Sequence, residues 1–130
     1  MSLIIATALL VAYANGANDN FKGVATLYGS DVISYKGAIR LATVATFAGS
    51  LASIVLAAGL VKVFSGKGVV PDDIAASSNF VTAVAAGAAG TVLLATALGF
   101  PISTTHGLTG AIVGAGTMAV GSEINLGVLA

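Results

Sequence analysis

Residues 15–20 read Asn15-Gly16-Ala17-Asn18-Asp19-Asn20, and they interrupt an apolar run that begins at Leu3. The run suits lipid, whereas the interruption places amides and a carboxylate at its end. An acid is costly in hydrocarbon, and a membrane segment that carries one generally uses it for transport, proton relay or ligand binding. The stretch therefore indicates an ion or solute site inside a membrane protein.

A second polar cluster lies far along the chain and reads Pro101-Ile102-Ser103-Thr104-Thr105-His106-Gly107. Pro101 closes the preceding apolar span, because proline cannot donate the helical hydrogen bond. The hydroxyls after it can cap a new helix. Non-helical backbone at membrane depth is tolerated only where protein or a water-filled cavity surrounds it. Two such interruptions therefore predict one shared cavity.

The composition belongs in a bilayer. The 130 residues are 57% hydrophobic and 8% charged, with a mean hydropathy of +1.03, whereas soluble domains are roughly a quarter charged. The formal net charge is zero, so there is no basic face for nucleic acid and we exclude that class of partner. The absence of cysteine excludes thiolate metal sites and thiol catalysis. We expect an all-α polytopic protein in the cell membrane, in contact with lipid.

The apolar segments predict discontinuous as well as continuous helices. A half-helix over residues 3–14 would be continued by another over residues 21–29, because the first alone is too short for a bilayer core of roughly 30 Å. Full spans are expected over residues 38–63 and 74–99, joined by an exposed turn over residues 65–73. Small residues that pack closely between helices are expected at two places, Ala45/Gly49/Ser53/Ala57 and Gly110/Gly114. With no separate soluble segment, residues 1–130 are treated as a single membrane domain.

The two interruptions together would bind both signs of charge. A half-helix that starts in the membrane offers free N–H groups and a positive dipole end to an anion, while oxygens elsewhere hold a coupling cation. The predicted anion-binding residues are Ser103, Thr104 and Thr105, and the predicted cation-binding residues are Asn15, Asn18 and Asp19. Asp and Asn oxygens suit a hard monovalent or divalent metal ion, with Asn18 and Asp19 as its main ligands. No cofactor beyond a coupling Na⁺ or H⁺ is expected.

Each of these residues also has a plainer interpretation. Asp19 would serve as an N-cap carboxylate for the half-helix after it, and residues 103–105 would only cap the helix after Pro101. Lys22 would pair with Asp19, extend to the membrane interface, or add positive charge beside the anion. His106, the only histidine, is expected to be a neutral donor or packing group, because a helix N-terminus disfavours its charged form.

At these two motifs the chain resembles the inorganic phosphate transporter (PiT) family. The family carries Gly-Ala-Asn-Asp near the N-terminus and Pro-x-Ser-Thr-Thr-His later in the same repeat, which stand here as residues 16–19 and 101–106. Thr26, Gly29 and Ser30 match part of the end of the first signature. Residues 20–23, Asn20-Phe21-Lys22-Gly23, depart from the small residues and Asn that usually follow, so that Lys22 stands beside the expected cation site.

The resemblance implies a secondary active transporter that moves phosphate with sodium or protons through a site made from two inverted repeats. Asn18, Asp19 and Lys22 would join the hydroxyls of residues 103–105 around the substrate. Sulfate permeases of the same family look similar at these positions, so sulfate or another oxyanion is the alternative substrate.

The resemblance covers one of the two repeats. Either the chain is part of a longer protein, or it is a half-size subunit that forms a homo-oligomer, with an antiparallel dimer completing the inverted repeat. Basic residues are balanced between two connections, with Lys36 and Arg40 on one and Lys62 and Lys67 on the other. That balance gives little orientation bias, as dual topology requires.

Two other function classes fit the sequence less well. An intramembrane hydrolase would use Ser103 and His106, but their spacing is that of a helix cap and no acid lies nearby to orient the imidazole, so the chain is not expected to be an enzyme. A non-transporting helical assembly subunit would explain the small residues, but it leaves Asp19 without a purpose.

Overall fold

The computed structural model describes residues 2–57 and 67–129, and over these residues the chain forms helices and no β-strand. The all-α prediction is confirmed. The α-helices are α1 (Ser2–Asp19), α2 (Ala25–Gly29), α3 (Tyr35–Leu56), α5 (Asp72–Ala75), α6 (Ser78–Ala97) and α7 (Thr104–Val120), and the 3₁₀-helices are η1 (Lys22–Val24), η2 (Gly121–Glu123) and η3 (Leu126–Leu129).

Serine side chains set where the long helices α3, α6 and α7 begin. Ser34 accepts a hydrogen bond from the Gly37 amide at the start of α3, and Ser77 accepts one from Phe80 at the start of α6. Ser103 caps α7 in the same way. Each hydroxyl satisfies an N–H that lacks a partner within its helix. The cap predicted before α7 is confirmed at Ser103.

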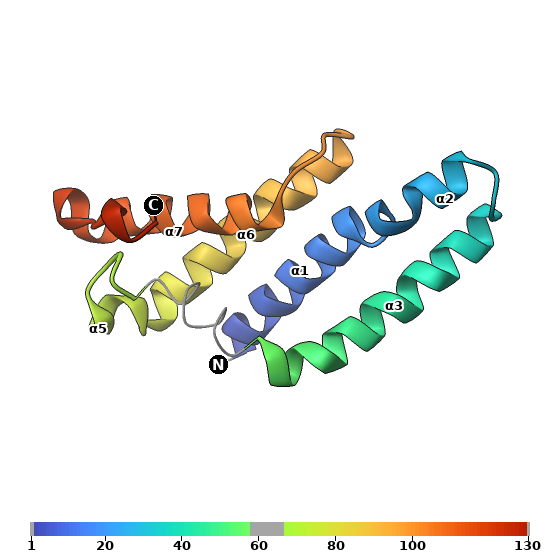
Figure 1. Ribbon diagram of the computed structural model, residues 1–130. Coiled ribbons are helices and arrows are strands. Elements are labelled where there is room, and N and C mark those ends of the chain that lie inside the picture. Colours follow the sequence, from blue (N-terminus) through green and yellow to red (C-terminus); the bar gives the residue numbers. More distant parts are fainter. Residues whose placement is uncertain (1, 58–66, 130) are drawn as a thin grey trace.

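Helix α6 packs against both α1 and α7 (Figure 1). Helices α1 and α6 run parallel: Leu3 lies near Ser78 at their beginnings, and Asn18 hydrogen-bonds Thr96 at their ends. Helix α7 returns along α6 in the opposite direction, because residues 98–103 reverse the chain, with Gly99 at a φ of +73°. The end of α1, the end of α6 and the start of α7 are therefore neighbours.

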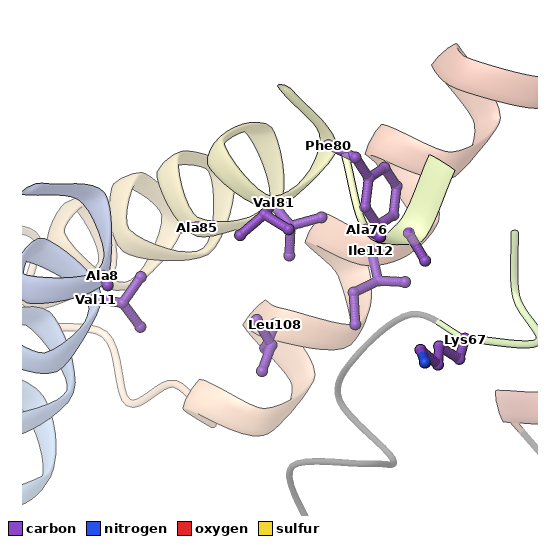
Figure 2. Close-up of a pocket in the computed structure, with 11 residues that line it drawn as sticks. Ala8, Val11, Lys67, Ala76, Phe80, Val81, Ala85, Leu108 and Ile112 are labelled. Atoms are coloured by element: carbon purple, nitrogen blue, oxygen red, sulfur yellow. The ribbon is translucent and has the colours of Figure 1, made fainter. Parts of the chain in front are cut away.

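Helices α1, α6 and α7 surround an apolar cavity of about 510 Å³ (Figure 2). Ala8 and Val11 of α1 face it from one side, Phe80 and Val81 of α6 from another, and Leu108 of α7 from the third. Its lining is mostly apolar, and Lys67 is the charged residue among the lining side chains.

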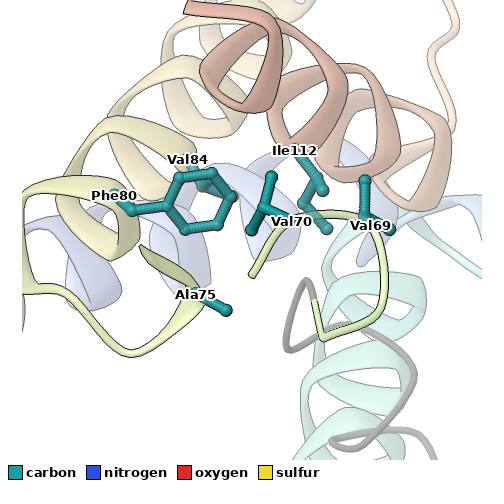
Figure 3. Packing of buried hydrophobic residues seen from close by; sticks show 6 residues of the cluster. All are labelled: Val69, Val70, Ala75, Phe80, Val84 and Ile112. Atoms are coloured by element: carbon teal, nitrogen blue, oxygen red, sulfur yellow. The ribbon is translucent and has the colours of Figure 1, made fainter. Parts of the chain in front are cut away.

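The core lies between α5, α6, α7 and the segment before α5. Its buried members come from all four, as Figure 3 shows for Val69, Val70, Ala75, Phe80, Val84 and Ile112. Gly116 allows the close approach here: a Cβ at this position would lie 2.9 Å from Ile124 Cδ1 and 3.1 Å from Val70 Cγ1. Burial of these side chains holds the α6–α7 pair together.

Helix α3 is attached mainly at its beginning. Ala38 and Ala42 pack on Val24 of η1, while the later side chains of α3 are exposed, with Val44 67%, Ile54 78% and Leu56 80% accessible. Among the described residues, α3 and α6 are long and apolar enough to cross a membrane. The exposed apolar face of α3 is what a helix in contact with lipid would show.

Several predicted boundaries are wrong. Helix α1 does not stop at Ala14 but continues through the amides to Asp19, and the α-helix gives way at Asn20 instead, before η1 and α2. The backbone bond from the Asn20 amide to the Gly16 carbonyl is intact at 3.0 Å. Asn side chains weaken helices by competing for backbone groups, and here Asn15 and Asn18 bond to other helices, which removes that competition.

The two predicted spans also differ in detail. Helix α3 begins at Tyr35 rather than residue 38, and residues 58–63 of that prediction lie outside the described residues. The prediction over 74–99 becomes the short α5 followed by α6, because Ser77 starts a new helix. Of the predicted turn over 65–73, residues 65 and 66 lie outside the described part of the chain, as does Lys62.

The predicted small-residue contact faces are not used among the described residues. Ala45, Gly49 and Ser53 are exposed on α3, and Ala57 is half-buried. On α7 a Cβ at Gly110 or Gly114 would meet nothing within 4 Å. The contact with α6 instead uses Gly107 and Ala111, which face Val92 and Gly87.

Candidate functional site

The structure brings the two polar motifs together at the junction of α1 and α7. The Thr104 hydroxyl, at the first residue of α7, lies 2.7 Å from Asn15 Oδ1 and 2.8 Å from Asp19 Oδ2. A hydroxyl has one proton to donate, so it serves one of these oxygens at a time. If the side-chain oxygen and nitrogen of Asn15 exchange places, Asn15 donates to the Thr104 hydroxyl while that hydroxyl donates to Asp19.

Asn18 connects the same junction to α6. Its side-chain amide donates to the Thr96 hydroxyl at 2.8 Å, and that hydroxyl donates to the Val92 carbonyl of its own helix at 2.7 Å. Three helices thus contribute to one polar cluster. Sequence reasoning missed Thr96, because a threonine within an apolar helix usually bonds only to its own backbone.

Lys22 of η1 lies over this cluster. Its ammonium forms an ion pair with Asp19 Oδ1, and it also hydrogen-bonds Asn18 Oδ1. A third bond, of 2.9 Å, reaches the carbonyl of Ile102 in the loop before α7. The Lys22 and Asp19 side chains are 47% and 39% exposed. Of the three interpretations of Lys22, the ion pair with Asp19 is the one that the structure shows.

Among the hydrogen bonds of the described residues, those of Ser103, Thr105 and His106 stay within the start of α7. The Ser103 hydroxyl accepts a hydrogen bond from the His106 amide at 3.4 Å and lies 2.8 Å from His106 Nδ1. The Thr105 side chain is exposed. Of the three hydroxyls that the sequence singled out, Thr104 alone bonds to the α1 cluster among the contacts of the described residues.

Asn20 shows at which level of α3 the polar cluster lies. Its side-chain oxygen accepts a hydrogen bond of 2.9 Å from the Thr46 hydroxyl, and its side-chain nitrogen lies 3.4 Å from the Thr43 hydroxyl. At a rise of about 1.5 Å per residue, Thr46 stands about 16 Å from the start of α3 at Tyr35 and about 15 Å from its end. The residue next to Asp19 is therefore level with the middle of α3.

The side chains at this junction offer a mixed set of groups. Asp19 supplies a carboxylate, Asn15 and Asn18 supply amides, and Thr104 supplies a hydroxyl, which together suit a hard cation better than a transition metal. The first N–H groups of α7 have no partner within the helix and carry the positive end of its dipole. The arrangement can therefore receive an anion and a cation close together.

Among the described residues, no group of three or more His, Cys, Asp or Glu side chains comes together as a metal site would require. A cavity of about 340 Å³ lies beside the start of α7, lined in part by Thr91, Ile102 and His106. Ile102 contacts both this cavity and the polar cluster, because it lines the cavity and its carbonyl oxygen accepts a hydrogen bond from Lys22.

Comparison with known proteins gives one consistent result. Residues 15–130 match the family described as "Phosphate transporter family". The chain is 35% identical over 130 residues to a "Putative phosphate permease" of Helicobacter pylori strain J99, covering 95% of this chain and 24% of that protein. It is 31% identical over 126 residues to a protein of the same description in Pyrococcus abyssi, covering 94% of this chain and 30% of the relative.

A third relative is the "Probable low-affinity inorganic phosphate transporter" of Mycobacterium bovis, which is 33% identical over 124 residues, with 92% of this chain and 27% of the relative covered. The chain thus spans about a quarter of the length of these relatives. No solved structure gives a significant match.

Proposed function

The chain belongs to the phosphate transporter family, and from this premise we propose that it forms one repeat of a secondary active transporter that moves inorganic phosphate across the cell membrane. Family membership makes it a membrane protein, and the names of the family and of its relatives indicate a transporter rather than an enzyme.

The observation that supports the proposal most strongly is the contact of Thr104 with Asn15 and Asp19. It joins the end of α1 to the start of α7, and the adjoining Asn20 is level with the middle of α3. Transporters place substrate sites near the bilayer midplane, where helix ends meet. If α3 spans the membrane, this junction lies at that depth.

The anion would be bound by the start of α7. The first N–H groups of Thr104 and Thr105 and the Thr104 hydroxyl are donors, and the Lys22 ammonium adds positive charge beside them. Ser103 would act indirectly, by holding the first turn of α7 in place. Donors and helix dipole together make a helix N-terminus suitable for phosphate.

Asp19 favours phosphate over sulfate. An ionised carboxylate only accepts hydrogen bonds, and phosphate at neutral pH still carries a P–OH group that donates, whereas sulfate carries none. A sulfate oxygen beside the Asp19 carboxylate would face another hydrogen-bond acceptor with no proton between them. An unfavourable contact of this kind lets a site reject a ligand of nearly the same shape. Sulfate or another oxyanion remains the alternative substrate, and a non-transporting assembly subunit is the alternative outside transport.

The coupling ion is part of the proposal. Asn15, Asn18 and Asp19 present side-chain oxygens on the last turn of α1, where a sodium ion or a proton would neutralise the carboxylate as the anion enters. A complete transport path needs a second, inverted repeat, supplied by a longer chain or by a second copy in an antiparallel dimer.

The test is uptake of radiolabelled phosphate and sulfate into proteoliposomes that contain the purified full chain. We expect phosphate uptake that exceeds the signal of protein-free liposomes and that excess unlabelled phosphate suppresses more than excess sulfate does. Uptake of sulfate alone would transfer the proposal to the alternative substrate. Uptake of neither anion, by protein that remains folded in the membrane, would refute transport by this chain.

A further inference from the structure

The Lys22 ammonium sits in a ligand shell of the kind that a metal cation uses. Its three oxygen partners differ in type: an amide oxygen of Asn18, a carboxylate oxygen of Asp19 and the backbone carbonyl of Ile102. Hard cations in proteins are bound by this same mixture of carboxylate, amide and carbonyl oxygens. The ammonium therefore occupies a position that a free cation could otherwise take.

The shell is built from two parts of the chain. Asn18 and Asp19 lie on the last turn of α1, whereas Ile102 lies 80 residues from Lys22, in the loop that precedes α7. A lysine that bridges these parts does the structural work of a coupling ion, because it holds the α1 end against the α7 start. Its charge also offsets Asp19, which would otherwise repel an incoming anion.

Extension to the membrane interface does not explain this geometry. Long basic side chains near helix ends usually extend toward water, but here the ammonium turns back to α1 and to the Ile102 carbonyl. The adjacent Asn20 bonds to Thr46, at the middle of α3. Lys22 is thus held at the level of the site rather than at the end of a span.

We propose that the Lys22 ammonium is a tethered cation that takes the place of sodium at this junction, so that phosphate uptake by this protein needs no sodium. The inference rests on the proposed phosphate transport. It narrows that proposal to transport without sodium, because the Asn18 and Asp19 oxygens bind the Lys22 ammonium in place of a sodium ion. A sodium ion at the same oxygens would meet a like charge, and removing that charge should free the oxygens for sodium.

The experiment compares the full chain with Lys22→Met, which keeps most of the side-chain length and removes the charge. Lys36→Met is the matched control, since Lys36 is exposed at the start of α3. Phosphate uptake into proteoliposomes is measured with sodium or choline as the cation. We expect wild type and Lys36→Met each to take up phosphate at the same rate in sodium as in choline. Lys22→Met should take up phosphate about fivefold or more faster in sodium than in choline, which is the lower end of ordinary coupling between two binding sites.

A second readout keeps the inference testable if Lys22→Met transports nothing. Sodium should raise the thermal unfolding midpoint of Lys22→Met in detergent, because a ligand stabilises the folded state that binds it, and should leave wild type at its choline value. Wild-type uptake that requires sodium, or a Lys22→Met midpoint that sodium does not raise, would overturn the inference while phosphate transport stands. Absence of phosphate uptake by wild type in either salt would instead refute the proposed function.

Discussion

Thr104 and Asp19 are 85 residues apart in the sequence, yet their side chains are 2.8 Å apart, because the first residue of α7 meets the last residue of α1. This contact closes the polar junction between the two motifs. Four predictions test the role of the junction and the packing that holds it.

Replacing Thr104 by Val should slow phosphate uptake strongly. Valine keeps the shape of threonine and removes the hydroxyl that faces Asn15 and Asp19. Loss of a hydrogen bond to a charged group corresponds to about 1.5–3 kcal/mol, or roughly tenfold to a hundredfold in rate if the bond serves transport. Initial uptake rates in proteoliposomes measure the effect. Thr117→Val is the control, since the Thr117 hydroxyl donates to the Val113 carbonyl of its own helix; equal rates in both variants would remove Thr104 from the mechanism.

Replacing Asp19 by Asn should abolish most phosphate uptake. The change keeps the size of the side chain, removes the negative charge and leaves the Lys22 ammonium without its ionic partner. Asp31→Asn is a suitable control because Asp31 has a positive φ of 58°, a conformation that asparagine also accepts. Wild-type uptake by Asp19→Asn would show that the carboxylate has no part in transport.

The bond between Asn18 and Thr96 should couple α1 to α6 energetically. We expect Asn18→Ala and Thr96→Val to be less than additive in a double-mutant cycle, with a coupling of about 0.5–1.5 kcal/mol in the free energy of unfolding. Denaturant unfolding in detergent measures the cycle. Strict additivity would mean that the 2.8 Å contact contributes nothing to the stability of the pair.

Gly116→Val should destabilise the protein by about 1–3 kcal/mol through overpacking. The first added carbon already approaches Ile124 and Val70 within 3.1 Å or less. Gly114→Val is the matched control on the same helix, because a Cβ there meets nothing within 4 Å. The difference between their thermal unfolding midpoints isolates the steric effect from helix propensity, and equal midpoints would contradict it.

Much of the fold could be predicted from local signals. Ser103 caps α7 just after Pro101, as its position predicts. The apolar spans near residues 38–63 and 74–99 correspond to α3 and α6 over the described residues. These features depend on composition and on neighbours a few residues away, so that sequence is enough to predict them.

The continuity of α1 could not be predicted in this way. Asn and Gly have low helix propensity, and the stretch from Asn15 to Asp19 looked like a break. Its amides are instead satisfied by Thr104 and Thr96 on other helices, so the backbone ladder stays intact. Tertiary contacts overrode the local preference.

The sequence by itself determined that this protein is helical, that it suits a membrane, and that an acid with amides and a group of hydroxyls are its two polar motifs. Only the tertiary structure decided that Thr104, and not Ser103 or Thr105, meets the acid, and that Lys22 binds across the gap to Ile102. The physical reason is that such contacts depend on how each helix is rotated about its axis and where its neighbour ends, which is settled by the packing of residues distant in the chain.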